Sequence, residues 1–124
     1  MNGNSLLIDT NIILYLLSGE ETLIPILEEK QLFISFITEL ELLAYPGIKE
    51  SDKTILMSFI RECKVIDIPN EVKTQTIDLR KKFNAKLPDA IIAATSLYIN
   101  SPLVTADKGF RKMDSHIDLI LYEK

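Results

Sequence analysis

Four acidic side chains occupy positions from which they could share a metal ion. Asp9 and Asp107 each come just after a short apolar run, Glu41 lies in a helical stretch after another such run, and Asp89 opens a long apolar helix. Carboxylate oxygens without a histidine or cysteine cluster suit Mg²⁺ or Mn²⁺ better than zinc. Such an ion activates water and neutralises charge on phosphoryl oxygens, so the expected chemistry is phosphodiester hydrolysis.

Asp9 is the acid that is hardest to explain as an ordinary surface residue. Apolar sequence brackets it on both sides, and no lysine or arginine precedes Lys30. Burial would therefore penalise its charge unless something neutralises it. Asp89 has the same difficulty, because it lies between Leu87 and an almost entirely apolar helix. A cation from solution would remove the penalty for both acids.

Each acid also has a structural explanation that needs no ligand. Asp9 and Asp107 could cap the helical segments that follow them. Thr38 and Glu41 have the spacing of a capping box, in which Glu41 would satisfy a backbone amide. Asp89 in a first helical turn would be favoured by the helix dipole. The functional interpretation therefore requires all four acids to meet at one place.

Short apolar runs alternate with longer helical patterns, which predicts an α/β fold with parallel strands and helical crossovers. The predicted strands cover residues 6–8, 32–36, 65–68, 103–105 and 118–122, and the predicted helices cover residues 11–17, 22–29, 39–45, 52–63, 71–83 and 88–99. Segments that follow the carboxyl ends of parallel strands share one edge of the sheet with the helix N-termini, and such folds bind ligands there. This architecture would bring the four acids to the same edge.

The composition indicates one compact domain, over residues 1–124, in a reducing compartment. Of the 124 residues, 47% are hydrophobic and 26% are charged, and the single Cys63 cannot close an internal disulfide. No apolar run is long enough to span a bilayer, and the first residues lack the features of a secretory signal. We therefore expect a cytoplasmic protein without membrane attachment. His116, the one histidine, has no ligand partner at a recognisable spacing.

The net charge of −4 argues against a protein that binds nucleic acid through a basic surface over its whole area. Local basic groups could still hold phosphates beside the acids. Residues 73–86, just before Asp89, contain five lysines and arginines and one acid. A second basic group follows Asp107. Charges of this kind also suit exposed helix ends. The candidates for substrate contact are Arg80, Lys86 and Lys108.

Four segments together resemble the PIN-domain ribonucleases, and most of all the VapC-type toxins of toxin–antitoxin systems. These segments are LIDTN at residues 7–11, ISFITELEL at 34–42, LPDAIIAA at 87–94 and LVTADKGF at 103–110. Each alone would be a weak signal, but their order and spacing are specific, and the resemblance covers essentially the whole chain. It implies a three-layer α/β/α fold around a central, mostly parallel sheet of about five strands.

The resemblance also implies roles for individual residues. The family's four catalytic, metal-binding acids fall on Asp9, Glu41, Asp89 and Asp107. Glu41 is preferred to Glu39 because the family places its glutamate three residues after a threonine, here Thr38. Asn11 and Thr105 would orient the carboxylates or the attacking water.

One position departs from the pattern of the family. Many relatives carry another acid where this chain has Gly109, which puts a complete second metal site in doubt. Otherwise the resemblance implies a Mg²⁺- or Mn²⁺-dependent endoribonuclease that cleaves single-stranded RNA. It also implies a homodimer and a small antitoxin protein whose C-terminal segment occupies the active-site groove.

Two interpretations from other classes stay open. One is a catalytically silent PIN-like module that binds RNA or a protein partner. The other is a phosphotransfer enzyme or receiver domain, which would also collect acids and Mg²⁺ at this edge. Dehalogenase-like phosphatases need a second aspartate where this chain has Asn11, and receiver domains need one after the third strand, where the sequence continues into Pro69 and Asn70. The sequence therefore favours the nuclease.

Overall fold

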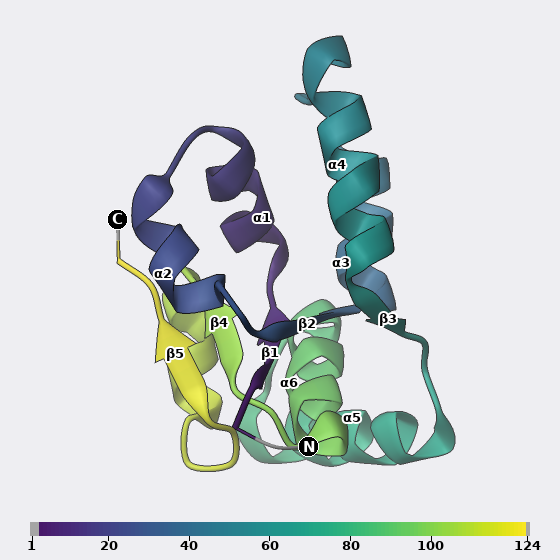
Figure 1. Cartoon of the computed structure of the whole chain (residues 1–124). Coiled ribbons are helices and arrows are strands. Elements are labelled where there is room, and N and C mark those ends of the chain that lie inside the picture. The colour runs from purple at the N-terminus through teal and green to yellow at the C-terminus, as the bar shows by residue number, and fades with distance from the viewer. Residues whose placement is uncertain (1–2, 124) are drawn as a thin grey trace.

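A five-stranded parallel sheet forms the centre of the protein in a computed structural model that describes residues 3–123 (Figure 1). The strands are β1 (Ser5–Ile8), β2 (Gln31–Ser35), β3 (Lys64–Ile66), β4 (Leu103–Thr105) and β5 (Leu119–Leu121). Their order across the sheet is β3-β2-β1-β4-β5, and each neighbouring pair is parallel. The order reverses between β1 and β4, and the crevice at such a reversal is where open α/β sheets bind ligands.

Helices connect the strands and cover both faces of the sheet, so the expected three-layer α/β/α fold is confirmed. They are α1 (Thr10–Leu17), the 3₁₀ helix η1 (Glu21–Leu23), α2 (Ile24–Leu27), α3 (Phe36–Leu43), α4 (Glu50–Glu62), α5 (Asn70–Phe83), α6 (Leu87–Ile99) and the 3₁₀ helix η2 (Lys108–Met113). Within residues 3–123, no helix combines the length and the apolar character that crossing a membrane requires.

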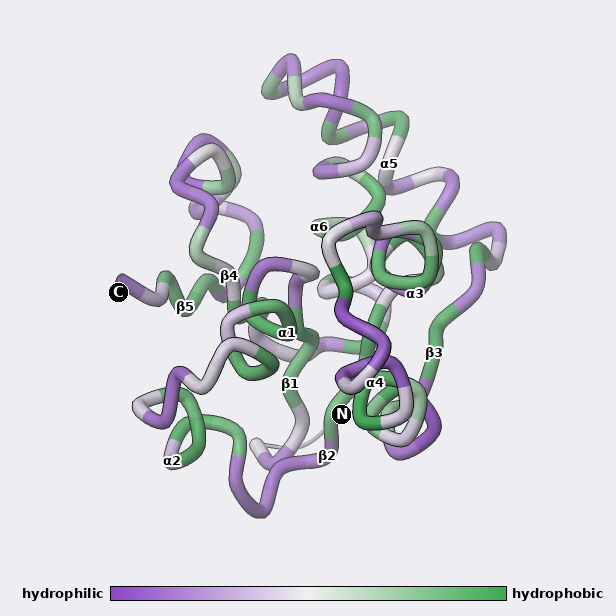
Figure 2. Tube along the Cα trace, turned by 90° about the horizontal axis from the view of Figure 1, so that it is seen from above, coloured by the Kyte–Doolittle hydropathy of each residue, from purple (hydrophilic) through white to green (hydrophobic). Residues whose placement is uncertain are grey.

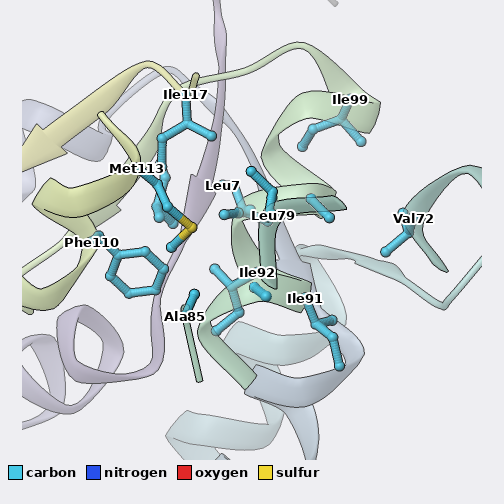
Figure 3. Packing of buried hydrophobic residues seen from close by; sticks show 14 of the residues in the cluster. Leu7, Val72, Leu79, Ala85, Ile91, Ile92, Ile99, Phe110, Met113 and Ile117 are labelled. Carbon is cyan, nitrogen blue, oxygen red and sulfur yellow. The ribbon is translucent and has the colours of Figure 1, made fainter. Parts of the chain in front are cut away.

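The alternation of side chains along β1 divides the core between the two faces of the sheet. Leu7 packs on one face with Phe33, Leu103 and residues of α5, α6 and η2 (Figure 3). Leu6 and Ile8 pack on the other face against α1 and α2. The hydrophobic segments accordingly gather around the central strands, and hydrophilic segments lie mostly at the periphery (Figure 2). This two-sided burial holds the end of β1 at a fixed place.

The expectation that residues 88–99 form a buried helix is confirmed by α6. Eight of its thirteen residues are buried, including a run of seven from Ala90 to Ser96. Pro88 stands in the first turn, where a missing amide hydrogen costs nothing. The small side chains let α6 pack closely along α5. Asp89 is thereby held where this buried helix begins.

Four of the expected helices lie within two residues of their predicted boundaries, and two differ more. The helix expected at residues 39–45 begins at Phe36, because Ser35 caps it and its Oγ accepts a hydrogen bond of 3.1 Å from the backbone N of Ile37. Thr38 therefore lies inside α3, and the capping-box explanation of Glu41 is wrong. The helix expected at residues 22–29 is divided into η1 and α2, because Pro25 favours a new helix start.

Candidate active site

The four acids predicted from the sequence lie at the carboxyl edge of the sheet. Asp9 caps α1 directly after β1, and Asp107 caps η2 after β4. Glu41 stands in α3, which follows β2, and Asp89 stands in the first turn of α6. Asp9 and Asp107 therefore flank the crevice where the strand order reverses.

Asp9 is the most buried of these acids, with 5% of its surface exposed. Its Oδ1 accepts a hydrogen bond of 2.8 Å from the backbone N of Thr10, so the capping explanation is correct for this oxygen. Its Oδ2 accepts bonds from Thr105 Oγ1 at 2.6 Å and from Asn11 Nδ2 at 3.2 Å. A carboxylate offers about four acceptor positions, so these three bonds orient Asp9 and leave about one position unused.

The charge of Asp9 is unfavourable in this environment. Burial raises the pKa of Asp9 above its ordinary value of 3.8, and the negative charges of Glu41 and Asp89 raise it further. The bonds from Thr105 and Thr10 lower the pKa but do not cancel the effect of burial. A carboxyl group whose pKa is raised by burial and by like charges is characteristic of functional sites. A nearby cation would stabilise the ionised form and lower this pKa.

Asn11 and Thr105 connect the ends of β1 and β4. Besides its bond to Asp9, Thr105 Oγ1 accepts a hydrogen bond of 3.0 Å from the backbone N of Asp107. Asn11 Oδ1 accepts one of 3.0 Å from the backbone N of Ala106. These bonds fix the start of the segment that carries Asp107 relative to the carboxylate of Asp9.

Asp107 is exposed, and its Oδ1 accepts a hydrogen bond of 2.8 Å from the backbone N of Gly109. The capping explanation is therefore correct for Asp107 as well. A Cβ atom at position 109 would lie 3.1 Å from this oxygen, which is a tight contact. Glycine thus lets the amide approach the carboxylate without crowding it.

Glu41 is exposed on α3, but its carboxylate is not free to rotate away from the other acids. Its Oε1 accepts a hydrogen bond of 2.6 Å from Thr10 Oγ1, in the first residue of α1. Its charge raises the pKa of both Asp9 and Asp89, which favours Glu41 over Glu39 as the fourth acid. Thr10 was not predicted as a site residue, and its place between Asp9 and Asn11 in the LIDTN segment is the one sequence signal that could have found it.

The pKa of Asp89 is affected by four charged side chains. Burial raises the pKa of Asp89, the charges of Asp107 and Glu41 raise it further, and the charges of Lys86 and Lys112 lower it. The net direction is upward, so the lysines do not compensate for burial and repulsion. Lys112 belongs to the basic group that follows Asp107, together with Lys108 and Arg111, but only Lys108 of this group is a predicted substrate contact.

No lysine or arginine forms an ion pair with any of the four acids within residues 3–123. The ion pairs in this part of the chain join Lys53 to Glu50, Lys82 to Asp78 and Arg111 to Glu123, and all of these side chains are largely exposed. The repulsion between the acids at the carboxyl edge is therefore not offset by an ion pair.

The donor set fits a hard divalent cation, although the acids would have to draw together to bind one in common. No group of three Asp, Glu, His or Cys side chains among the described residues is close enough to hold a metal ion. Repulsion between carboxylates opposes a closer approach, and a dication would remove that repulsion. Oxygen donors of this type suit Mg²⁺ or Mn²⁺.

The three residues predicted to contact substrate lie near this edge or at the end of α5. Lys86 is close enough to Asp89 to lower its pKa, and Lys108 directly follows Asp107 at the start of η2. Arg80 is partly committed elsewhere, because its Nε donates a hydrogen bond of 3.1 Å to the carbonyl oxygen of Ala85. All three side chains belong to exposed residues.

His116 and Cys63 stand apart from the acids. The His116 ring makes an edge-on contact with Phe83, with the ring centroids 5.0 Å apart. Cys63 is buried in the cluster that includes Leu56 and Ile60. The explanation of these two residues as surface and core positions is therefore sufficient.

The sheet order and the acids at its carboxyl edge define a three-layer α/β/α domain with an acidic site suited to a divalent cation. The PIN domain family matches residues 6–115, and the chain belongs to this family. Among curated proteins, no sequence matches it significantly. The family and fold that the sequence resembles are thus confirmed.

Similar solved structures come from toxin–antitoxin systems. A toxin–antitoxin complex from Klebsiella pneumoniae has a chain that is 28% identical, with a TM-score of 0.82, over 96% of this chain and 99% of that one. VapBC2 from Rickettsia felis, bound to a DNA fragment from its promoter, has the same TM-score and coverage at 21% identity. VapBC-5 from Mycobacterium tuberculosis aligns at 16% identity and a TM-score of 0.71, over 98% of this chain and 99% of that one.

Proposed function

We propose that this PIN domain is a Mg²⁺- or Mn²⁺-dependent endoribonuclease that cleaves single-stranded RNA. The observation that carries the proposal is the electrostatics of the carboxyl edge. Burial raises the pKa of both Asp9 and Asp89; the charges of Glu41 and Asp89 raise that of Asp9 further, and the charges of Asp107 and Glu41 raise that of Asp89. No ion pair compensates these acids in the described part of the chain. Keeping these carboxylates ionised lowers the stability of the folded protein unless a cation binds among them.

Asp9, Glu41, Asp89 and Asp107 would hold the metal ion in this proposal. The ion, when bound, would activate a water molecule and offset charge on the phosphoryl oxygens. The protein's own groups do the positioning. Thr105 and Asn11 hold the carboxylate of Asp9, and the amide of Gly109 holds that of Asp107. Oriented carboxylates of this kind need little rearrangement during the reaction.

Lysines beside the acids would admit the phosphate backbone to a negatively charged site. Lys86, at the start of α6, and Lys112, in η2, both lower the pKa of Asp89. Lys108 adds another exposed cation next to Asp107, and Arg80 one at the end of α5. Basic side chains that contact phosphates contribute affinity without base specificity. We therefore expect these four residues to affect RNA binding more than the rate of cleavage.

We propose that the nuclease is the toxin of a toxin–antitoxin pair and acts in the cytoplasm. Similarity to chains of toxin–antitoxin complexes supports an antitoxin partner. A gene for a small DNA-binding protein immediately beside the gene for this chain would support the toxin role. Its absence would leave the nuclease activity standing.

The expected homodimer is supported by apolar side chains that this chain leaves exposed. Leu40 and Leu43 of α3 are 56% and 52% exposed, and the nearby Tyr45 is 45% exposed. Large apolar side chains left exposed close together in the sequence are candidates for an interface with another protein. Light scattering should therefore give twice the mass of the chain, and Leu43→Glu should shift the protein towards the monomer.

RNA cleavage by the purified protein tests the enzymatic proposal. The wild type should cut single-stranded RNA in Mg²⁺ or Mn²⁺ and lose this activity in EDTA. Asp107→Asn removes one exposed acid and should abolish cleavage, whereas Glu39→Gln, the matched control on α3, should not. A catalytically silent module would instead bind RNA equally well in EDTA and give no product on prolonged incubation.

A further inference from the structure

Thr10 makes one contact with each of two acids that come from different elements. Its backbone N donates a hydrogen bond of 2.8 Å to Asp9 Oδ1, and its hydroxyl donates one of 2.6 Å to Glu41 Oε1. Asp9 directly follows β1, and Glu41 is 31 positions from Thr10 in the sequence, on α3. A single residue at the start of α1 therefore touches both carboxylates.

Glu41 needs such a contact more than Asp9 does. It has a long side chain on an exposed residue, and holding it in one conformation costs rotamer entropy. Asp9, by contrast, is buried and is also held by Thr105 and Asn11. The short bond from the Thr10 hydroxyl is charge-assisted, which makes it stronger than a bond between neutral groups.

Thr10 is suited to this contact by its own stiffness. Its branched Cβ restricts the rotation that would carry the hydroxyl away from Glu41. Thr10 Oγ1 also lies 3.3 Å from Oγ1 of Thr38, which is fully buried and stands one turn before Glu41 in α3. The hydroxyl of Thr10 is thus held between α1 and α3.

We infer that Thr10 is a positioning residue that sets the separation between the carboxylates of Asp9 and Glu41. The inference rests on the proposed binding of a metal ion by these acids. Its two contacts are separable, because any residue other than proline at position 10 keeps the backbone N–H bond to Asp9. The bond to Glu41, by contrast, comes from the hydroxyl of Thr10. Removing the hydroxyl therefore tests the positioning of Glu41 without removing the cap of α1.

Calorimetric titration of the full-length protein with Mn²⁺ tests the inference without any measurement of cleavage. Thr10→Val keeps the branched shape and loses the hydroxyl, and we expect its Mn²⁺ affinity to fall by about 10-fold or more. Thr10→Ser restores the hydroxyl and should restore most of the affinity. Thr76→Val is the matched control, because it removes a buried hydroxyl that bonds only within α5, to the carbonyl oxygen of Val72.

A double-mutant cycle shows whether the effect passes through Glu41. Glu41→Ala should weaken Mn²⁺ binding by itself, and adding Thr10→Val to it should cause little further loss. Thr10→Val that binds Mn²⁺ as tightly as the wild type, while Glu41→Ala binds weakly, would overturn this inference alone. A wild type that binds no Mn²⁺ would overturn the proposed function and this inference with it. If Thr10→Val does not fold, Thr10→Ala measures the same loss.

Discussion

Thr105 Oγ1 donates a hydrogen bond of 2.6 Å to Asp9 Oδ2, although the two residues are 96 positions apart in the sequence. The contact exists because β4, which ends at Thr105, pairs with β1 in the sheet. Both residues are buried, and the bond lowers the pKa of Asp9 against the larger effect of burial. One buried hydroxyl thus offsets part of the cost of keeping this carboxylate ionised.

Replacing this hydroxyl should destabilise the protein. Thr105→Val preserves the shape of the side chain but deprives Asp9 Oδ2 of a donor and the backbone N of Asp107 of an acceptor. Because hydrogen bonds to charged groups in buried sites are worth more than average, we expect a loss of about 2 kcal/mol in the free energy of unfolding. Urea denaturation measures this loss. Thr105→Ser keeps the hydroxyl and should lose markedly less; an equal loss in both variants would attribute the effect to packing of the methyl group.

The stability of the metal-free protein should depend on the protonation of Asp89. The pKa of Asp89 is raised above 3.8 in the folded protein, so protonation favours the folded state. The contribution of Asp89 to the free energy of unfolding is most favourable at a pH below its pKa in the unfolded chain. This contribution is lost as the pH rises through the higher pKa of Asp89 in the folded protein. Asp89→Asn has no such loss, so its unfolding free energy relative to the wild type should increase between about pH 4 and pH 7. A difference that stays constant or decreases over this range would contradict the assigned direction of the pKa.

Divalent metal should stabilise the folded protein through Glu41 and not through Glu39. Ligands that bind only the folded state raise the melting temperature, and a concentration 100-fold above Kd contributes about 2.7 kcal/mol. Differential scanning fluorimetry with Mg²⁺ or Mn²⁺ should therefore show a shift for the wild type and for Glu39→Gln, and a reduced shift for Glu41→Ala. A reduced shift in Glu39→Gln alone would transfer the role to that residue.

The thiol of Cys63 should be unreactive in the native protein. Burial raises the pKa of this thiol to about 11, and the charge of Glu62 acts in the same direction. At about pH 8 only about one thiol in a thousand would then be ionised. Mass spectrometry should find slow alkylation by iodoacetamide in buffer and rapid alkylation in denaturing urea. Rapid labelling of the folded protein would mean that the core around α4 opens readily.

The layers of the fold were predictable from the sequence because their signals are local. Short apolar runs gave the five strands to within about two residues, and the apolar character of residues 88–99 gave the buried α6. The start of α3 was predicted three residues late, because Ser35 ends an apolar run and also caps the next helix. Because Ser35 belongs to both β2 and the cap of α3, no polar loop separates the strand pattern from the helix pattern.

The contacts around the acids were not predictable in the same way. That the four acids belong to one edge followed from strand direction alone, and the capping roles of Asp9 and Asp107 followed from their positions before helices. The bond between Thr10 and Glu41 depends instead on how α1 packs against α3, which no local pattern determines. The effect of Lys112 on Asp89 likewise depends on the placement of η2 beside α6.

The central claim is that Asp9, Glu41, Asp89 and Asp107 share a divalent cation, and a crystal structure of the protein with Mn²⁺ tests it most directly. An anomalous difference map should show a Mn²⁺ peak among these side chains, with their carboxylate oxygens directly coordinating the ion. A map that leaves this edge empty at saturating Mn²⁺, with lysine ammonium groups paired to the acids instead, would contradict the account.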